Sequence, residues 1–192
     1  MTPPSQSASS RGRQIGGLCL GVIAGSAVLG VAAGYLWAAV APRPLLTMTG
    51  HGVASVINPE TNAFIAADGL YCLICLAGGV ITGALGYVFA VRIAGPPAMA
   101  AVLAGALAAG LLAAWIGDQS GLAGYHHLLA TLPAGALLRG RLILSAKTAI
   151  TLWPLAACLT AGAVELTGAM RARRPAAVSA IRTDPRPDRT AP

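Results

Sequence analysis

Four long stretches of the chain contain no charged residue, namely residues 14–42, 69–91, 93–117 and 148–164. Because about 20 residues of apolar helix cross the hydrocarbon core of a bilayer, the first three are long enough, and apolar neighbours extend the fourth. An open sheet edge cannot cross lipid, and the strict alternation of barrel strands is absent. We therefore predict an all-α membrane protein with four transmembrane helices. Their predicted bounds are 15–41, 69–91, 98–117 and 146–170.

A fifth charge-free stretch, residues 119–138, is interrupted by glycine, proline and a histidine pair. Its apolar residues recur at helical spacing, so we interpret it as a short amphipathic segment at the membrane surface; a fifth span or a re-entrant segment is the alternative. With four spans, nine Lys and Arg flank one side of the membrane and four flank the other. Basic flanks stay in the cytoplasm, so both termini are predicted to be cytoplasmic. A fifth span would place the basic C-terminus outside.

The two loops expected outside the membrane, residues 42–68 and 118–145, carry strand-like patterns. In the first loop, two apolar and β-branched runs flank His51 and its two glycine neighbours, which predicts a short β-hairpin. Segment 137–144 of the second loop has a pattern that would pair with it. An isolated hairpin is only marginally stable. We therefore expect both loops to form a small β-containing extracytoplasmic cap, supported by the helices or by a partner.

The ends of the chain are polar. Residues 1–14 and 171–192 have too few apolar side chains to bury a core, so both are predicted to be disordered and cytoplasmic. The six Arg residues of the basic tail are expected to lie near anionic lipid headgroups. Nucleic-acid binding is disfavoured, because Pro and Asp interrupt the tail and aromatic residues are missing. Ala41 ends a sequence like a signal-peptidase site, but Pro42 follows it, so we expect the first span to remain uncleaved.

Composition supports a membrane protein over two other classes. The 192 residues include 13 Lys and Arg and 6 Asp and Glu, which is 10% charged residues, and the apolar share is 56%. The mean hydropathy is +0.71. A soluble domain carries about 25% charged residues, and disordered chains are polar and highly charged. These values argue against a cytosolic enzyme, and the small number of ionisable groups leaves little basis for acid–base catalysis.

Small residues recur at four-residue spacing in the predicted helices, as in Gly17, Gly21 and Gly25 of the first and Gly79 and Gly83 of the second. Lipid offers no hydrophobic drive for helices to associate, so small residues must let their backbones approach. We interpret these stripes as packing surfaces within the monomer. The alternative is a homo-oligomer interface.

Two proline sites divide or bend the predicted helices. Gly95-Pro96-Pro97 ends one helix and starts the next, which makes the second and third spans an antiparallel hairpin. Trp153-Pro154 predicts a kink near the middle of the fourth helix.

Cys72 and Cys75 form a C-x-x-C sequence about one turn into the second predicted helix. Four spans with such a pair near the outer side resemble the thiol–quinone oxidoreductases that reoxidise periplasmic disulfide donors. Those enzymes need a second cysteine pair in the other outer loop, but Cys19 and Cys158 lie in other predicted spans. Apolar surroundings also disfavour the thiolate. We therefore expect buried structural thiols, with redox chemistry as the alternative.

Asp68 precedes Gly69 at the predicted start of the second helix. There an aspartate would cap free backbone N–H groups and favour the positive end of the helix, which is our interpretation. A functional role together with Glu60 or Asp118, the other acids of the outer face, is the alternative.

The remaining polar candidates are Glu165 and three histidines. A proton or cation relay needs an acid near the middle of the membrane. Glu165 lies near the inner end of its span, so we expect it to pair with Arg92 or with an arginine of the tail. His51, His126 and His127 could suggest a metal site, but adjacent helical residues point about 100° apart. Polar interface positions are the simpler interpretation, and we predict no metal site, no cofactor and no catalytic residue.

The order of these features resembles a group of actinobacterial membrane proteins catalogued as a domain of unknown function (number 2567). The resemblance covers about residues 15–168, and its most specific part is the Ala67-Asp68-Gly69 junction. The other matching parts are Leu36-Trp37, Ala41-Pro42-Arg43, Arg92, Gly95 and Trp153-Pro154-Leu155. It implies four spans in a plasma membrane and supplies no activity.

Together these patterns predict a multi-pass plasma-membrane protein with a structural or accessory role in the cell envelope and no catalysis of its own. Its expected partners are the lipid bilayer and another membrane or envelope protein, not nucleic acid. Two alternatives remain: a thiol–disulfide oxidoreductase using Cys72 and Cys75, and a small oligomeric transporter using Glu165.

Overall fold

A computed structural model provides the fold. It describes residues 5–50, 53–56, 62–120, 135–140 and 144–182, together with residues 122, 127, 131, 133 and 142. Within these residues, four helices are long and apolar enough to cross a membrane. The four-helix prediction is therefore confirmed at the level of length and composition.

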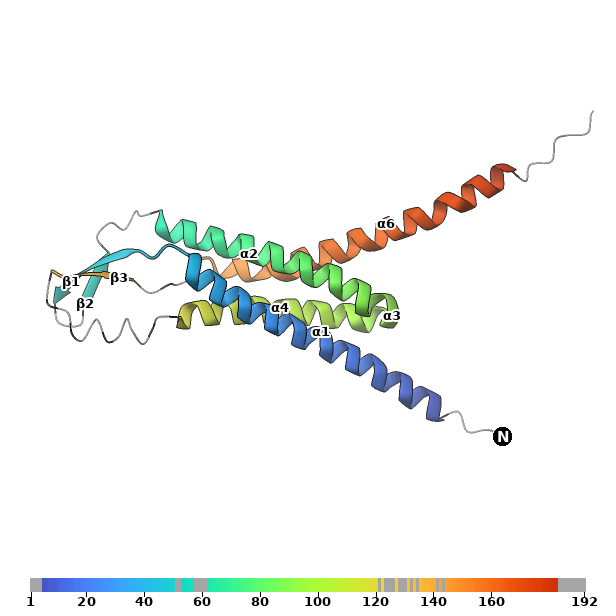
Figure 1. Ribbon diagram of the computed structural model, residues 1–192, viewed down its shortest axis with the longest axis horizontal. Helices are drawn as coiled ribbons and strands as arrows, with labels where there is room; N and C mark the ends of the chain where they lie inside the picture. The colour runs from blue at the N-terminus through green and yellow to red at the C-terminus, as the bar shows by residue number, and fades with distance from the viewer. Residues whose placement is uncertain are drawn as a thin grey trace, which may run out of the picture.

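The helices form an elongated bundle (Figure 1). α1 (Ser5–Val40) is followed by α2 (Ala63–Gly86), which continues through the π-helical turn η1 (Tyr87–Val91) and the short α3 (Arg92–Ala94). α4 (Pro96–Gln119) returns along the bundle. The last helix, α6 (Leu152–Arg182), follows the 3₁₀ segment η2 (Lys147–Thr151). The candidate spans within them are Ser10–Val40, Ala63–Ala94, Pro96–Gln119 and Lys147–Arg171.

Three helix ends differ from the predicted bounds. α1 begins at Ser5 and α6 ends at Arg182, so parts of both predicted disordered ends are helical. α2 begins at Ala63, six residues before the predicted position. The reason is common to all three, because a charged or polar residue marks where a helix can leave lipid and does not stop its hydrogen bonding. Residues after 182 lie outside the described part of the chain.

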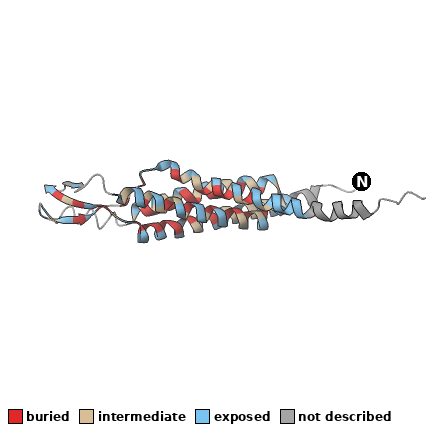
Figure 2. Ribbon diagram, turned by 90° about the horizontal axis from the view of Figure 1, so that it is seen from above, coloured by how far each residue is buried: buried red, intermediate tan, exposed pale blue. Residues whose placement is uncertain are grey.

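Glycine brings the helix backbones together in two pairs. α1 packs most extensively on α4, and α2 on α6, with both pairs running parallel. A Cβ atom added at Gly30 would lie 2.5 Å from Ala109 O, and one added at Gly79 would lie 2.5 Å from Trp153 O. The interpretation of these glycines as contacts within the monomer is therefore confirmed. Figure 2 shows buried positions facing the interior of the bundle and exposed positions along its outside.

The glycines in the first half of α1 behave differently. A Cβ atom added at Gly17, Gly21 or Gly25 would meet nothing within 4 Å. For these three positions the prediction of packing within the monomer is wrong. The reason is that α1 diverges from α2 in this region, as Figure 1 shows.

The predicted hairpin of helices is confirmed at Gly95. Gly95 adopts φ 66° and ψ −140°, a conformation that favours glycine, and Pro96 occupies the first turn of α4. The Gly95 N–H donates to Val91 O at 2.8 Å, which closes the preceding helical turn. This end of the bundle is called the α3 end below.

A three-stranded antiparallel sheet lies at the opposite end, called the sheet end below (Figure 1). β1 (Leu45–Gly50) pairs with β2 (Val53–Val56) and with β3 (Leu137–Arg139), in the order β2-β1-β3. Leu46 stands opposite both Val56 and Leu138. This confirms the predicted hairpin and its pairing with the second loop. Leu46 and Leu138 are buried whereas Leu45 and Leu137 are exposed, as alternation along a strand requires.

Trp153-Pro154 does not kink the middle of a helix. α6 begins at Leu152, so Pro154 lies in its first turn, directly after the 3₁₀ segment η2. Proline has no N–H, and the first turn of a helix needs none, so this is the position where it costs least. The amphipathic segment predicted over 119–138 falls largely outside the described residues.

Candidate functional site

Asp68 connects two helices at the sheet end. Its Oδ1 accepts a hydrogen bond from Ser145 N at 3.1 Å, and its Oδ2 accepts one from Ala146 N at 2.9 Å. The two amides directly precede η2, so the carboxylate on α2 holds the start of the fourth span. Such charge-assisted bonds are about twice as strong as neutral ones.

The prediction that Asp68 caps its own helix is wrong. α2 starts at Ala63, its N-cap is Asn62, and the Asn62 side chain makes no capping bond. Asp68 lies in the second turn, and its carboxylate satisfies amides from a segment 77 residues later in the chain. Sequence spacing cannot identify such distant amide partners. Asp118, a suggested companion, lies near the end of α4, and Glu60 is outside the described residues.

Two aromatic side chains connect α2 with α1 and α4. Trp37 Nε1 donates to Ala67 O at 2.9 Å, and Tyr71 Oη donates to Gly110 O at 2.7 Å. The two rings meet edge to face, with centroids 5.1 Å apart and an interplanar angle of 64°. Both side chains are fully buried, so their polar atoms need these partners.

Trp153 makes a similar contact between α6 and α2. Its Nε1 donates to Thr82 Oγ1 at 3.2 Å, and its ring packs against Gly78. α2 therefore bonds directly to all three other spans. The sequence patterns did not predict this network. The available signal was that Trp37, Tyr71 and Trp153 carry polar atoms within apolar spans, where each must find an acceptor.

Neutralising the Asp68 carboxylate should weaken the contact between α2 and the start of the fourth span. We expect Asp68→Asn to lower the free energy of unfolding by about 1–3 kcal/mol, because one of two charge-assisted acceptors becomes a donor facing a backbone N–H. Hydrogen exchange should accelerate at Ser145 and Ala146. Asp68→Glu, which keeps the charge, is the control and should lose less. If the hydrogen-exchange rates of both amides were the same in Asp68→Asn as in the parent protein, the Asp68 carboxylate would not be their hydrogen-bond acceptor.

Cys72 and Cys75 are arranged for packing. All four cysteines have free thiols. Cys75 is fully buried in the core cluster with Tyr71, and Cys72 is half-buried. Thiol exchange needs an exposed attacking sulfur. Within the described part of the chain, the geometry provides no approach to Cys75.

Glu165 and the histidines do not assemble into a site. Glu165 is exposed on α6, and among the described side chains it forms no ion pair, so the expected pairing with Arg92 is not found. The alternative partners, the arginine side chains after Arg171, lie outside the described side chains. Among the described residues, no three His, Cys, Asp or Glu side chains lie close enough together to hold a metal ion. His127 is exposed, and His51 and His126 lie outside the described residues.

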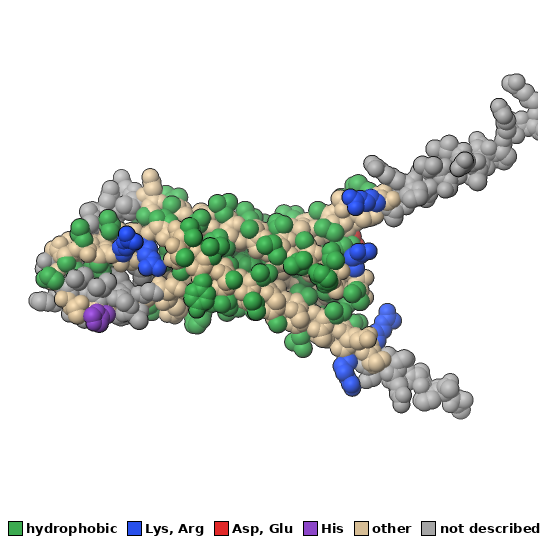
Figure 3. All heavy atoms as spheres, in the orientation of Figure 1, with side chains coloured by type: hydrophobic (Ala, Val, Ile, Leu, Met, Phe, Trp, Pro, Cys, Tyr) green, Lys and Arg blue, Asp and Glu red, His purple; other side chains and the backbone are tan. Residues whose placement is uncertain are grey.

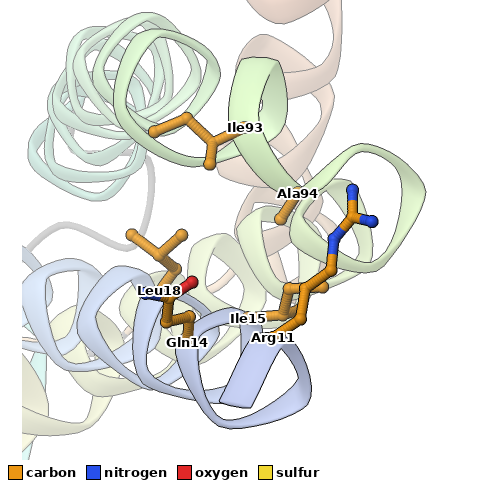
Figure 4. Close-up of a pocket in the computed structure, with 6 residues that line it drawn as sticks. All are labelled: Arg11, Gln14, Ile15, Leu18, Ile93 and Ala94. Carbon is orange, nitrogen blue, oxygen red and sulfur yellow. The ribbon is translucent and has the colours of Figure 1, made fainter. Parts of the chain in front are cut away.

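A groove between α1 and α2 is the most distinctive concave feature described. It has a volume of about 640 Å³, and its lining extends from Gly17 to Leu29 on α1 and from Thr82 to Ala90 on the facing helix. A second cavity of about 640 Å³ continues from it to the α3 end, and the two share Leu18. Figure 4 shows the second cavity, with Leu18 and Arg11 on α1 facing Ile93 and Ala94. We call the two together the α1–α2 groove.

No family model, curated protein or solved structure matches this chain at a significant level.

Proposed function

We propose that this chain is an integral plasma-membrane protein with four spans, the sheet outside, both termini in the cytoplasm, and an accessory role in the cell envelope. The observation that supports it is the belt of exposed apolar side chains around the helices. Leu20 is 69% exposed, Leu73 63%, Trp115 61% and Leu159 66%, one on each long helix. A contiguous apolar surface of this extent would be unfavourable in water and is suited to lipid.

The charges support the same placement. Figure 3 shows Lys and Arg side chains at the two ends of the bundle, with hydrophobic side chains between them. At the α3 end the described cations include Arg11, Arg13, Arg92 and Arg171, and the sheet end has Arg43, Arg139 and Lys147. The more basic end faces the cytoplasm in most membrane proteins.

An accessory role is consistent with the polar side chains of the bundle, because they bond to neighbouring helices and loops. Asp68, Tyr71 and the two buried tryptophans all bond to backbone or side chains of neighbouring elements. The arrangement builds a rigid scaffold that presents a small sheet on one side of the membrane. We infer that the sheet contacts another envelope protein, because β2 and β3 are edge strands whose outer hydrogen-bonding groups have no partner strand within the sheet.

Thiol-specific crosslinking in intact cells tests both parts of this proposal. In a chain with all four cysteines replaced by alanine, Ser55→Cys places one thiol on the exposed face of β2, and Arg92→Cys places one at the α3 end. A membrane-impermeant reagent with a maleimide at one end and a photoreactive diazirine at the other should react with Ser55→Cys in intact cells and, on irradiation, join it to a reproducible envelope protein. Arg92→Cys should react only after permeabilisation.

Two results would contradict the proposal. Reaction of Arg92→Cys in intact cells would reverse the orientation. If Ser55→Cys reacted with reagents of several lengths but formed no protein adduct with any of them, the proposed contact of the sheet with an envelope protein would be contradicted.

A further inference from the structure

α1 and α2 are packed together at one end and separated at the other. At the sheet end Trp37 bonds to Ala67, so the two helices are in contact. Toward the α3 end no residue of α1 before Ser26 is buried among those whose side chains are described, and the helices diverge (Figure 1). The α1–α2 groove occupies this separation.

The walls of the groove are apolar and uneven in bulk. Gly17, Gly21 and Gly25 form a smooth wall on α1, where an added Cβ atom meets nothing within 4 Å. Leu85 and Phe89 stand on the facing helix. Of the two hydroxyl groups in the lining, that of Ser26 donates to Val22 O and that of Thr82 accepts from Trp153 Nε1. The chain therefore provides partners for both hydroxyls, and the groove offers an occupant almost only apolar contacts.

The mouth of the groove is polar and cationic. Arg11 and Gln14 line it together with Ile93 and Ala94, and Arg92 precedes them at the same end of the bundle. Figure 4 shows the Arg11 side chain extending from α1 toward Ala94 at the entrance. A ligand that fits this groove therefore has an anionic group at one end and a long apolar part at the other.

The groove is long enough to hold a lipid of one leaflet. Its lining on α1 extends from Arg11 to Leu29, which are 18 residues or about 27 Å apart at about 1.5 Å per residue. Half of a bilayer, from headgroups to midplane, is about 20–22 Å. An occupant with its charge at Arg11 would reach the middle of the membrane beside Gly25.

We propose that the α1–α2 groove binds an anionic phospholipid of the leaflet at the α3 end, with its phosphate at Arg11 and an acyl chain along Gly17, Gly21 and Gly25. This inference rests on the membrane placement proposed above. A second copy of α1 is a poorer occupant. Parallel pairing along the glycine wall would bring Arg11 and Arg13 of both copies together, and like charges repel.

Photolabelling with a defined lipid tests this assignment. The full chain is reconstituted into bilayers containing phosphatidylglycerol with a diazirine in its acyl chain, and labelled peptides are mapped after irradiation. We expect the segments around 11–29 and 82–90 to be labelled above the lipid-facing part of α6, which serves as the internal reference. The double variant Gly21→Leu, Gly25→Leu should reduce their labelling to the reference level by filling the groove.

Two further variants distinguish lipid binding in the groove from a general effect of the substitutions on labelling. Gly16→Leu, the same change on the same helix but outside the groove lining, should keep the parent labelling. Arg11→Gln should reduce the preference for phosphatidylglycerol over phosphatidylcholine about fivefold, which corresponds to about 1 kcal/mol for one basic residue.

The remaining outcomes overturn the assignment. Labelling that stays above the reference in the double leucine variant would exclude the groove as the lipid site. Groove segments labelled no more than α6 would show a membrane protein without this site, which leaves the membrane placement intact. A crosslinked dimer through Gly21→Cys in place of lipid labelling would identify the occupant as a second copy. Absence of labelling in every segment, α6 included, would overturn the placement and the lipid site together.

Discussion

Replacing Trp37 with alanine is expected to lower the free energy of unfolding by about 3–5 kcal/mol, because a fully buried indole leaves a large cavity. The loss has three sources. The ring contacts Tyr71 edge to face, its Nε1 donates to Ala67 O, and Gly117 packs directly against it. Unfolding in detergent by a graded denaturant, followed by circular dichroism, measures the change.

Two variants show which part of the indole matters. Trp37→Phe keeps an aromatic ring but removes the N–H donor, so it should lose about 1 kcal/mol from the hydrogen bond together with part of the packing. Trp115→Ala is the matched control, because Trp115 is 61% exposed on the outside of α4 and should change stability little. If Trp37→Ala and Trp115→Ala destabilised the protein equally, α1 would not be held to α2 as described.

Adding one methyl group at Gly83 is expected to destabilise the bundle by about 1–3 kcal/mol, the usual cost of overpacking. A Cβ atom there would lie 2.8 Å from Ala157 Cα, so the clash is with backbone that no side-chain rotation relieves. The same substitution at Gly21 meets nothing within 4 Å. Alanine is favoured over glycine in a helix interior by about 1 kcal/mol, so Gly21→Ala should be neutral or stabilising.

The test is the difference in stability between the two variants, because Gly83→Ala should lower stability and Gly21→Ala should not. Thermal denaturation of Gly83→Ala and Gly21→Ala in the same detergent gives the comparison directly. Gly30→Ala should follow Gly83→Ala, because its Cβ would lie 2.7 Å from Ala109 Cα on α4. Destabilisation by Gly21→Ala of the same size as Gly83→Ala would mean that the first half of α1 is packed within the monomer.

The sequence patterns predicted the helices, the β-hairpin and the Gly95 turn. A helix can cross lipid only where a long run of consecutive residues is apolar, and such a run is visible in the sequence. Absence of charge located the four helices, and turn residues with β-branched neighbours located the hairpin around His51. The Gly95-Pro96-Pro97 turn was predictable for the same reason, since each residue restricts its own backbone. These features depend on neighbours in the chain, which the sequence displays.

The site features could not be predicted, because each depends on contacts between distant segments. The position of Asp68 before Gly69 predicts a cap on its own helix, whereas its partners are amides of a segment that follows α4. Gly21 and Gly83 belong to stripes with the same spacing, yet only Gly83 has a neighbouring helix against it. The direction in which α1 diverges depends on the whole bundle, and spacing along one helix contains no information about it.

The divergence of the helices has a consequence for the membrane itself. Buried residues end at Ser26 toward the start of α1 and at Ala161 toward the end of α6, within the side chains described. α1 and α6 therefore spread apart across one half of the bundle, and the protein is broader there than at the sheet end (Figure 1). In a bilayer the outline of the protein would therefore be wider in one leaflet than in the other, with lipid of that leaflet between the diverging helices. The boundary shared by protein and lipid would be longer on that side, so the two leaflets would differ in the number of lipid molecules that the protein holds beside it.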